Sequence, residues 1–176
     1  KENDPANPLS YYGWSKLEAE NLLINKSNNW SILRTILVYG IVNDMSRSNI
    51  VLWAKSALES GKELKVVDDQ FRMPTLAEDL AMGCFLCEKL NANGIFNISG
   101  KDFMSVYEMV ERVAQHYGLK MDTVQKVKSD TLNQAAKRPL VTGFDLTKSQ
   151  QILGYNPHSF EEGMNILDEQ IKSLSH

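Results

Sequence analysis

Apolar residues recur every three to four positions along several stretches of the chain, which is the spacing of one buried helix face. This pattern predicts helices over residues 10–26, 50–58, 75–90, 105–118 and 147–154, and a last one in which Phe160, Met164, Leu167, Ile171 and Leu174 share a face. Thr75, Ser105 and Ser159 each precede a glutamate by three positions, which is the spacing of a capping box at a helix start. A short helix is also expected over residues 129–136.

Short runs rich in β-branched and aromatic residues lie between these helices and predict strands. They run from Trp30 to Val38, Leu64 to Val67, Ile95 to Ile98 and Val124 to Val127. The first run is largely apolar, as expected of a strand that is buried in a parallel sheet. Polar segments are expected over residues 43–49 and 68–74. Strands that alternate with helices predict an α/β fold, in which ligands bind where the strands end.

Composition and charge narrow the class of protein. The chain has 176 residues, 43% of them apolar and 23% charged, which is typical of one soluble globular domain. Its net charge of −3 offers no basic surface for nucleic acid, and no apolar run approaches the ~18 residues of a membrane span. We therefore expect a cytoplasmic protein without nucleic-acid or membrane partners. Cys84 and Cys87 lack neighbouring ligands and are interpreted as core residues, so no metal site is expected.

Tyr12 and Lys16 stand four residues apart near the start of the first predicted helix. On a helix this spacing places both side chains on one face, about 6 Å apart at Cβ. A phenol beside an ammonium group is suited to proton transfer, so the pair is a candidate for general acid–base catalysis. The spacing also fits two side chains on the solvent side of a helix, and the surrounding residues favour the catalytic interpretation.

Glu2, Pro8, Tyr12-Gly13-x-Ser15-Lys16 and Glu20 resemble a signature of the extended short-chain dehydrogenases/reductases. Ile32-Leu33-Arg34-Thr35 with Val38-Tyr39-Gly40 resembles the next strand of that family. Other segments resemble the branch that contains dTDP-4-dehydrorhamnose reductase. These segments are Asp69-Gln70, Pro74-Thr75, Asp79-Leu80-Ala81, Arg138-Pro139, Asp145, Lys148, Leu153-Gly154 and Glu162-Gly163. The resemblance covers nearly the whole chain.

The resemblance implies the C-terminal part of a Rossmann-like NAD(P)-binding fold with a small mixed α/β substrate-binding region. Residues 1–102 would belong to the dinucleotide-binding domain and carry the Tyr-x-x-x-Lys helix. Residues 103–176 would form a mainly helical substrate-binding region. The implied cofactor is NADP or NAD.

The resemblance also implies roles for individual residues. Tyr12 would give a proton to a keto oxygen as hydride arrives from the cofactor. Lys16 would hold the nicotinamide ribose, so that both residues are catalytic and cofactor-binding. Leu37, Val38 and Tyr39 would pass under the nicotinamide.

A glycine-rich nucleotide-binding turn is absent from the sequence. None of the ten glycines falls in a Gly-x-Gly-x-x-Gly or Gly-x-x-Gly-x-x-Gly pattern, which close approach to a pyrophosphate requires. In the family this turn and a catalytic serine or threonine precede the tyrosine. We therefore expect the chain to be the C-terminal part of a longer polypeptide and to be inactive alone.

The family branch implies reduction of a nucleotide-linked 4-keto-6-deoxysugar. Arg72 is the strongest candidate for a diphosphate contact, because a planar guanidinium fits such a group well. Asn49 and Arg138 are further candidates for substrate binding. Leu37 stands where this branch tends to carry a tryptophan that packs on the sugar, so the identity of the sugar is open. Whether the protein forms a homodimer is open as well.

Two alternative functions remain open on the sequence. A non-catalytic regulatory subunit of methionine adenosyltransferase, which binds a dinucleotide and a partner enzyme, belongs to the same branch and also lacks the tryptophan. A sugar-nucleotide epimerase or dehydratase shares the tyrosine–lysine pair but needs further acid–base residues upstream. A serine or threonine on the strand before Lys1 would favour an enzyme over the regulator.

Overall fold

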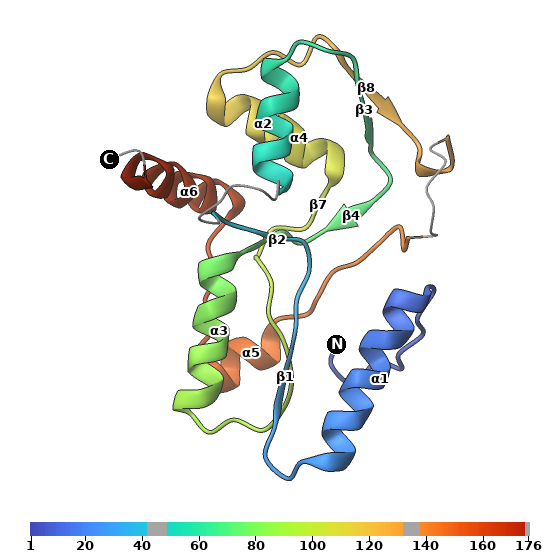
Figure 1. The fold of residues 1–176 in the computed structure, drawn as a ribbon, viewed down its shortest axis with the longest axis vertical. Coiled ribbons are helices and arrows are strands. Elements are labelled where there is room, and N and C mark those ends of the chain that lie inside the picture. Colours follow the sequence, from blue (N-terminus) through green and yellow to red (C-terminus); the bar gives the residue numbers. More distant parts are fainter. Residues whose placement is uncertain (42–48, 132–137, 175–176) are drawn as a thin grey trace.

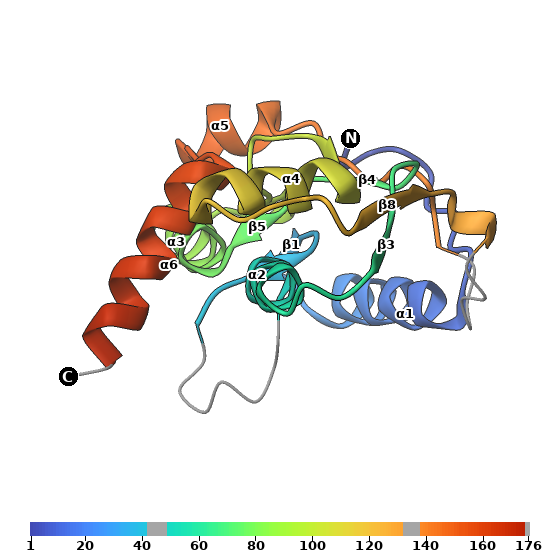
Figure 2. The ribbon, with the colours of Figure 1, turned by 90° about the horizontal axis from the view of Figure 1, so that it is seen from above.

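The computed structural model describes residues 1–41, 49–131 and 138–174, and it shows an elongated α/β molecule with two lobes (Figure 1). The lower lobe of Figure 1 contains helices α1 (Tyr11–Lys26), α3 (Ala77–Lys89) and α5 (Thr147–Leu153) with strands β1 (Ser31–Arg34) and β6 (Gly94–Asn97). The upper lobe contains helices α2 (Ile50–Glu59) and α4 (Val106–Tyr117) with strands β3 (Leu64–Val67) and β8 (Val124–Val127). Helix α6 (Phe160–Leu174) joins from the side, and its C-terminal end projects from the body (Figure 2).

Short strands connect the lobes. They are β2 (Val38–Tyr39), β4 (Phe71–Arg72), β5 (Thr75–Leu76) and β7 (Met104–Ser105). The strands of the described residues form four pairs, of which β1–β6, β2–β5 and β3–β8 are parallel and β4–β7 is antiparallel. In the first pair Ser31 lies opposite Gly94 and Arg34 opposite Asn97. Parallel strands between helices confirm the α/β class that the sequence predicts.

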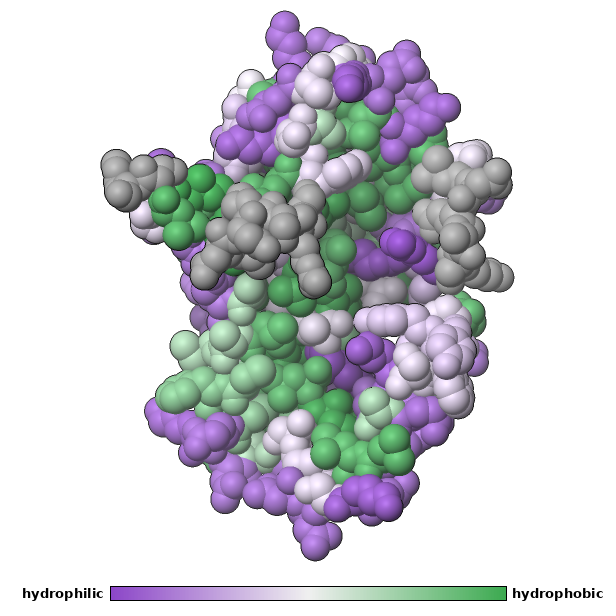
Figure 3. Space-filling view, in the orientation of Figure 1, coloured by the Kyte–Doolittle hydropathy of each residue, from purple (hydrophilic) through white to green (hydrophobic). Residues whose placement is uncertain are grey.

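Two clusters of buried apolar side chains form the core. The first lies among α2, α4, α6 and β2, and its fully buried members include Val51, Met109, Val110, Val113, Met164 and Leu167. The second lies among β6, α3 and α5 and includes Phe96, Ile98, Leu153 and Tyr155. Both clusters draw residues from either side of residue 102, and the division of the chain at that residue stays a prediction. On the face in Figure 3, hydrophobic residues gather toward the middle of the molecule, and hydrophilic residues predominate at its two ends.

Two of the three expected capping boxes are confirmed. At α4 the Ser105 hydroxyl accepts from the Glu108 N–H, and the Glu108 carboxylate accepts from the Ser105 N–H. Ser159 and Glu162 make the same two bonds at the start of α6. Each box satisfies backbone donors that a helix start leaves without partners.

The third expected capping box, at Thr75, is wrong. Thr75 and Leu76 form strand β5, and α3 begins only at Ala77, with no side-chain bond from its N-cap residue. The reason is tertiary, because Thr75 pairs with β2 as part of strand β5, and its hydroxyl donates to the carbonyl oxygen of Ile36 at 2.7 Å. The spacing of Thr75 and Glu78 in the sequence does not show whether the hydroxyl bonds to the helix start or to the Ile36 carbonyl.

The expected strand from Trp30 to Val38 is interrupted. β1 ends at Arg34 and β2 begins at Val38, because the backbone turns at Leu37, whose φ is 46°. The expected loop over residues 68–74 also differs, since it contains the short strand β4.

Some expectations fall partly outside the described residues. Of the polar segment 43–49 only Asn49 is described, and residues 132–136 of the expected helix 129–136 are not. Ser129–Thr131 form a short 3₁₀ helix. Among the described residues no helix has the length and apolar character needed to cross a membrane.

Candidate active site

Helix α1 presents Tyr12 and Lys16 on one face, as their spacing predicts. The Nζ atom of Lys16 lies 5.4 Å from the centroid of the Tyr12 ring. The helix begins at Tyr11 because the Ser10 hydroxyl caps it and accepts from the Gly13 N–H at 3.2 Å. Tyr12 is 72% exposed, so its phenol is open to a ligand. The catalytic roles of the pair stay predictions.

The two signature glutamates hold this helix in place. Glu20 forms a double ion-pair contact with Arg34 of strand β1, with Nε–Oε1 at 2.9 Å and Nη2–Oε2 at 2.6 Å. Such a planar, two-point contact fixes orientation as well as distance. Glu2 accepts from the backbone N–H of Asn97 on β6 at 3.0 Å, and its carbonyl oxygen accepts from Arg34. Helix α1 is therefore tied to the β1–β6 pair through these residues.

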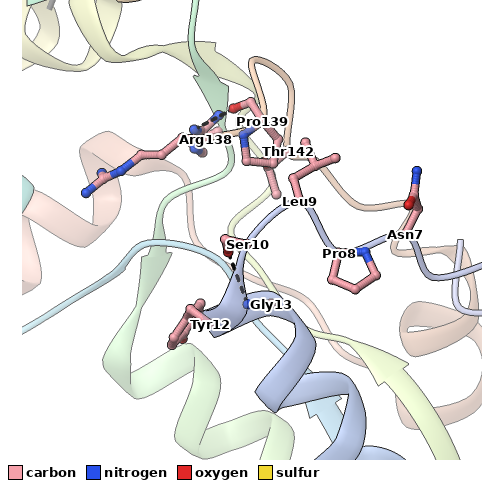
Figure 4. Close-up of a pocket in the computed structure, with 10 residues that line it drawn as sticks. Asn7, Pro8, Leu9, Ser10, Tyr12, Gly13, Arg138, Pro139 and Thr142 are labelled. Atoms are coloured by element: carbon pink, nitrogen blue, oxygen red, sulfur yellow. Dashed lines mark hydrogen bonds between the residues drawn. The ribbon is translucent and has the colours of Figure 1, made fainter. Parts of the chain in front are cut away.

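Tyr12 lines a cavity of about 720 Å³, here called the Tyr12 cavity (Figure 4). One side is formed by the N-terminal loop and the first turn of α1, which contribute Ser10 and Tyr12. Arg72, Arg138 and Thr142 line it from strand β4 and the segment after residue 137. In Figure 4 the segment with Arg138 lies above Tyr12. The structure thus brings together three of the residues that the sequence singles out, although they lie far apart in the chain.

Arg72 is largely occupied by protein oxygen atoms. Its Nη1 donates to the carbonyl oxygens of Phe71 and Leu140 at 2.7 and 3.0 Å. Its Nη2 donates to the Pro139 carbonyl oxygen at 2.8 Å and to Oε1 of Gln70 at 3.2 Å. The guanidinium therefore fastens the segment after residue 137 to strand β4. This arrangement fixes the neighbouring Arg138 at the cavity and leaves Arg72 fewer donors for a phosphate.

A second cavity of about 340 Å³ adjoins the first, because Arg72 and Arg138 line both. We call it the Leu37 cavity; Trp53 and Lys65 also line it. Among the described residues that line the two cavities none is an aspartate or glutamate. Burial, and then the charge of Arg138, lower the pKa of Arg72, so two guanidinium groups repel each other here. An anion between them would relieve that repulsion.

The remaining candidate residues take other positions. Asn49 caps α2, since its Oδ1 accepts from the N–H groups of Val51 and Leu52 at 3.0 and 3.1 Å. Tyr39 is 2% exposed and packs edge-on against Phe160 in the core. Val38 is exposed and is the first residue of strand β2, directly after Leu37. Their roles in binding substrate or cofactor stay predictions.

Several cavity residues were not predicted from the sequence. Ser10 has a signal, because a serine before a helical pattern is a typical N-cap. Thr142, Trp53 and Lys65 have none, since only the fold brings them to Arg138.

Tyr12 is exposed and offers a proton donor, and the nearby Lys16 offers a cation. Leu37 and Val38 are exposed as well and offer apolar surface. That these residues bind one end of a dinucleotide stays a prediction. For the pyrophosphate the chain offers no glycine-rich turn. Among the described residues no group of three or more His, Cys, Asp or Glu is placed to hold a metal ion.

Comparisons with known proteins agree with this geometry. The family described as the RmlD substrate binding domain matches residues 1–172. A dTDP-4-dehydrorhamnose reductase of Aggregatibacter actinomycetemcomitans is 31% identical over 175 residues, which cover 93% of this chain and 58% of the relative. The methionine adenosyltransferase 2 subunit beta of Xenopus tropicalis is 28% identical over 157 residues, which cover 86% of this chain and 47% of that protein. The chain thus spans about half the length of these relatives.

A solved structure shows the same fold. The dTDP-4-dehydrorhamnose reductase of Bacillus anthracis, determined in complex with NADP, superimposes with a TM-score of 0.86 at 24% identity. The match covers 96% of this chain and 58% of that one. The expected α/β fold, similar to that of Rossmann-like NAD(P)-binding proteins, is therefore confirmed. With the family match over residues 1–172, these findings show that the chain belongs to the RmlD substrate-binding domain family, within the extended short-chain dehydrogenases/reductases.

Proposed function

We propose that the protein reduces the keto group of a nucleotide-linked 4-keto-6-deoxysugar with NADPH or NADH. One observation carries this proposal: Tyr12 lines the same cavity as Arg72 and Arg138, and none of the described lining residues is a carboxylate. A cavity with a proton donor at one wall and cations at another suits a substrate that joins a carbonyl to a diphosphate.

When bound, the nicotinamide cofactor supplies hydride to the carbonyl carbon. Tyr12 donates the phenolic proton to the keto oxygen, which becomes a hydroxyl group. Lys16, at 5.4 Å from the ring centroid, stabilises the negative charge that remains on the phenolate. Arg138 binds the diphosphate, and the apolar side chain of Leu37 borders the space that remains for the sugar.

The named relatives support this reaction. The reductase of Aggregatibacter actinomycetemcomitans is named for a dTDP-linked keto sugar, and the Bacillus anthracis structure holds NADP. A thymidine diphosphate sugar is therefore the first substrate to test. A cytoplasmic location stays a prediction.

A regulatory function is the alternative, and a specific observation favours it. The relative from Xenopus tropicalis is named as a subunit of methionine adenosyltransferase 2. In that case the chain would bind a dinucleotide and a partner enzyme without turning over a sugar. The alternative predicts that mixing with a methionine adenosyltransferase changes the kinetics of that enzyme.

The proposed function is tested by oxidation of NADPH, followed by absorbance, in the intact protein. dTDP-, UDP- and GDP-linked 4-keto-6-deoxyhexoses are compared side by side, and we expect the dTDP sugar to react fastest. If no nucleotide sugar is reduced while a methionine adenosyltransferase responds to mixing, the regulatory function is correct instead.

Replacement of Tyr12 tests the chemical step. Tyr12→Phe keeps the ring and removes the proton, so we expect turnover to fall by at least ~10²-fold, the usual contribution of a positioned general acid. Binding of dTDP, measured by calorimetry, should stay unchanged. Tyr11→Phe is the matched control, because Tyr11 is the neighbouring residue, is 80% exposed and packs against Trp14 away from the cavity lining. Equal turnover in both variants would show that Tyr12 is not the acid.

A further inference from the structure

The backbone between strands β1 and β2 takes a conformation that its sequence does not favour. Leu37 has a φ of 46°, in the left-handed region. Outside glycine this region is uncommon, and asparagine and aspartate are enriched there rather than leucine. In the described part of the chain Asn91, with a φ of 50°, is the other non-glycine residue with positive φ. Leu37 therefore needs neighbours that hold it in this conformation.

Thr75 of strand β5 provides these contacts. Its hydroxyl donates to the carbonyl oxygen of Ile36 at 2.7 Å, and its backbone N–H donates to the carbonyl oxygen of Leu37 at 3.2 Å. The Thr35 hydroxyl lies 3.3 Å from the Thr75 hydroxyl and donates to it. Thr75 is 0% exposed, so water does not compete for these bonds. One threonine thus contacts three consecutive residues of the turn.

The surroundings hold Thr75 itself in place. A Cβ at Gly100 would overlap the Pro74 carbonyl oxygen, so the Gly100 backbone lies directly against the residue before Thr75. In the β2–β5 pair Thr75 lies opposite Val38, the residue that follows Leu37. The contacts to the turn therefore start from a buried strand.

The turn at Leu37 forms part of the wall of the Leu37 cavity. Leu37 is 39% exposed and lines the Leu37 cavity together with Trp53, Arg72 and Arg138. Relaxation of Leu37 to a negative φ would redirect its side chain, and one apolar wall of that cavity would change shape. The two arginines come from other elements and would not move with it.

We infer that Thr75 is a positioning residue, whose hydroxyl holds Leu37 in the left-handed conformation and so sets the wall beside the sugar. This inference rests on the proposed function, because a sugar linked to the diphosphate gives that wall its role. Thr75 touches no substrate and acts through Leu37. Its loss should therefore change the chemical step, while binding of the diphosphate, which depends on Arg138, is kept.

The conformational part of this inference is tested without ligand. Thr75→Val removes the hydroxyl and keeps the side-chain shape, whereas Thr75→Ser keeps the hydroxyl. Ser149→Ala is the matched control, because the Ser149 hydroxyl is also 0% exposed and bonds to a strand carbonyl, that of Asn97, outside both cavity linings. We expect the ¹³C-methyl resonances of Leu37 to move in Thr75→Val, but not in Thr75→Ser or Ser149→Ala. Unmoved resonances in Thr75→Val overturn the inference, whatever the protein catalyses.

The kinetic part is tested in the intact protein with the dTDP sugar. In Thr75→Val we expect kcat to fall about 10²-fold, because a displacement of about 1 Å can have this effect. The Kd for dTDP should stay within about twofold, and Thr75→Ser should restore kcat. Ser149→Ala should lower the Tm without changing kcat. An unchanged kcat in Thr75→Val would refute the positioning role. If the Leu37 resonances move in Thr75→Val but the wild-type protein reduces no nucleotide sugar, the proposed function is refuted instead.

Discussion

At the scale of single residues, the two arginines of the cavities have different tasks. Arg72 donates four hydrogen bonds to protein oxygen atoms, three of them backbone carbonyls. Arg138 is exposed and lines both cavities. The sequence favours Arg72 as the diphosphate contact, because it sits in a loop before a predicted helix. The structure makes Arg138 the stronger candidate and Arg72 the residue that places it.

This division predicts two different variant phenotypes. Arg138→Ala should weaken dTDP binding roughly 10- to 150-fold, since a hydrogen bond to a charged group contributes about 1.5–3 kcal/mol and each 1.4 kcal/mol is about tenfold. Its Tm should stay unchanged. Arg72→Ala should weaken binding and also lower the Tm, because the segment after residue 137 loses its hydrogen bonds to strand β4. Calorimetry and thermal unfolding measure both quantities.

The control for this pair is Arg112→Ala, which removes an exposed arginine that pairs with Glu161 at 3.0 Å. We expect neither affinity nor Tm to change appreciably, since exposed ion pairs contribute little. If Arg72→Ala weakened binding while its Tm matched wild type, the structural task of Arg72 would be refuted.

The same residues show where sequence reasoning stops. The Tyr12–Lys16 pair follows from local spacing, so it was predictable. The turn at Leu37 was not, because leucine has no preference for positive φ and Thr75 enforces it from a strand that lies 38 residues further along the chain. The carbonyl partners of Arg72 were equally hidden, since residues 139 and 140 reach it only in the folded chain.

At the scale of elements, helix starts were predictable where the cap is local. Ser105 and Ser159 bond within their own first turn, so the pattern alone identifies them. Thr75 has the same spacing but bonds across to Ile36, and the helix begins two residues later. Strands β1, β3, β6 and β8 were predictable in position but not in pairing, because β3 pairs with β8 from a distant part of the chain. The two-residue strands β4, β5 and β7 were not predicted.

The cap of α6 gives a pH dependence whose sign is defined. The Ser159 N–H, and then Lys101, lower the pKa of Glu162 from 4.5 to about 2. A carboxylate with a depressed pKa in the folded state stabilises the fold above its unfolded pKa, and this contribution is lost as the pH falls from 4.5 to about 2.

We therefore expect Glu162→Gln to lower the Tm by a few degrees at pH 7 and to have little effect near pH 2, in a series of thermal unfolding curves. Glu161→Gln is the control, because Glu161 stands next to it and is not part of the cap. A Tm difference that persists undiminished at pH 2 would show that the Glu162 charge does not stabilise the helix start.

At the scale of the whole molecule, Tyr12 lies on the one α-helix of the described residues that has no buried residue. Helix α1 has no buried residue among its 16, whereas Met109, Val110 and Val113 of α4 are 0% exposed. What orients Tyr12 is the polar junction of Arg34, Glu20 and Glu2, rather than apolar burial.

This contrast predicts how the chain opens. Local stability follows buried apolar contacts, so backbone amides of α1 should exchange with deuterium at least about tenfold faster than those of α4 in the 176-residue chain. Arg34→Ala removes the double contact to Glu20. The side chains of Arg34 and Glu20 are 24% and 18% exposed. The substitution should raise exchange in α1 by a further factor of about ten, equivalent to about 1.4 kcal/mol, and leave α4 unchanged.

The control is Arg112→Ala, which breaks an ion pair of α4 instead and should not affect α1. Mass spectrometry of the three proteins decides the matter, and α1 amides as protected as those of α4 would mean that the polar junction holds the helix as firmly as a core does.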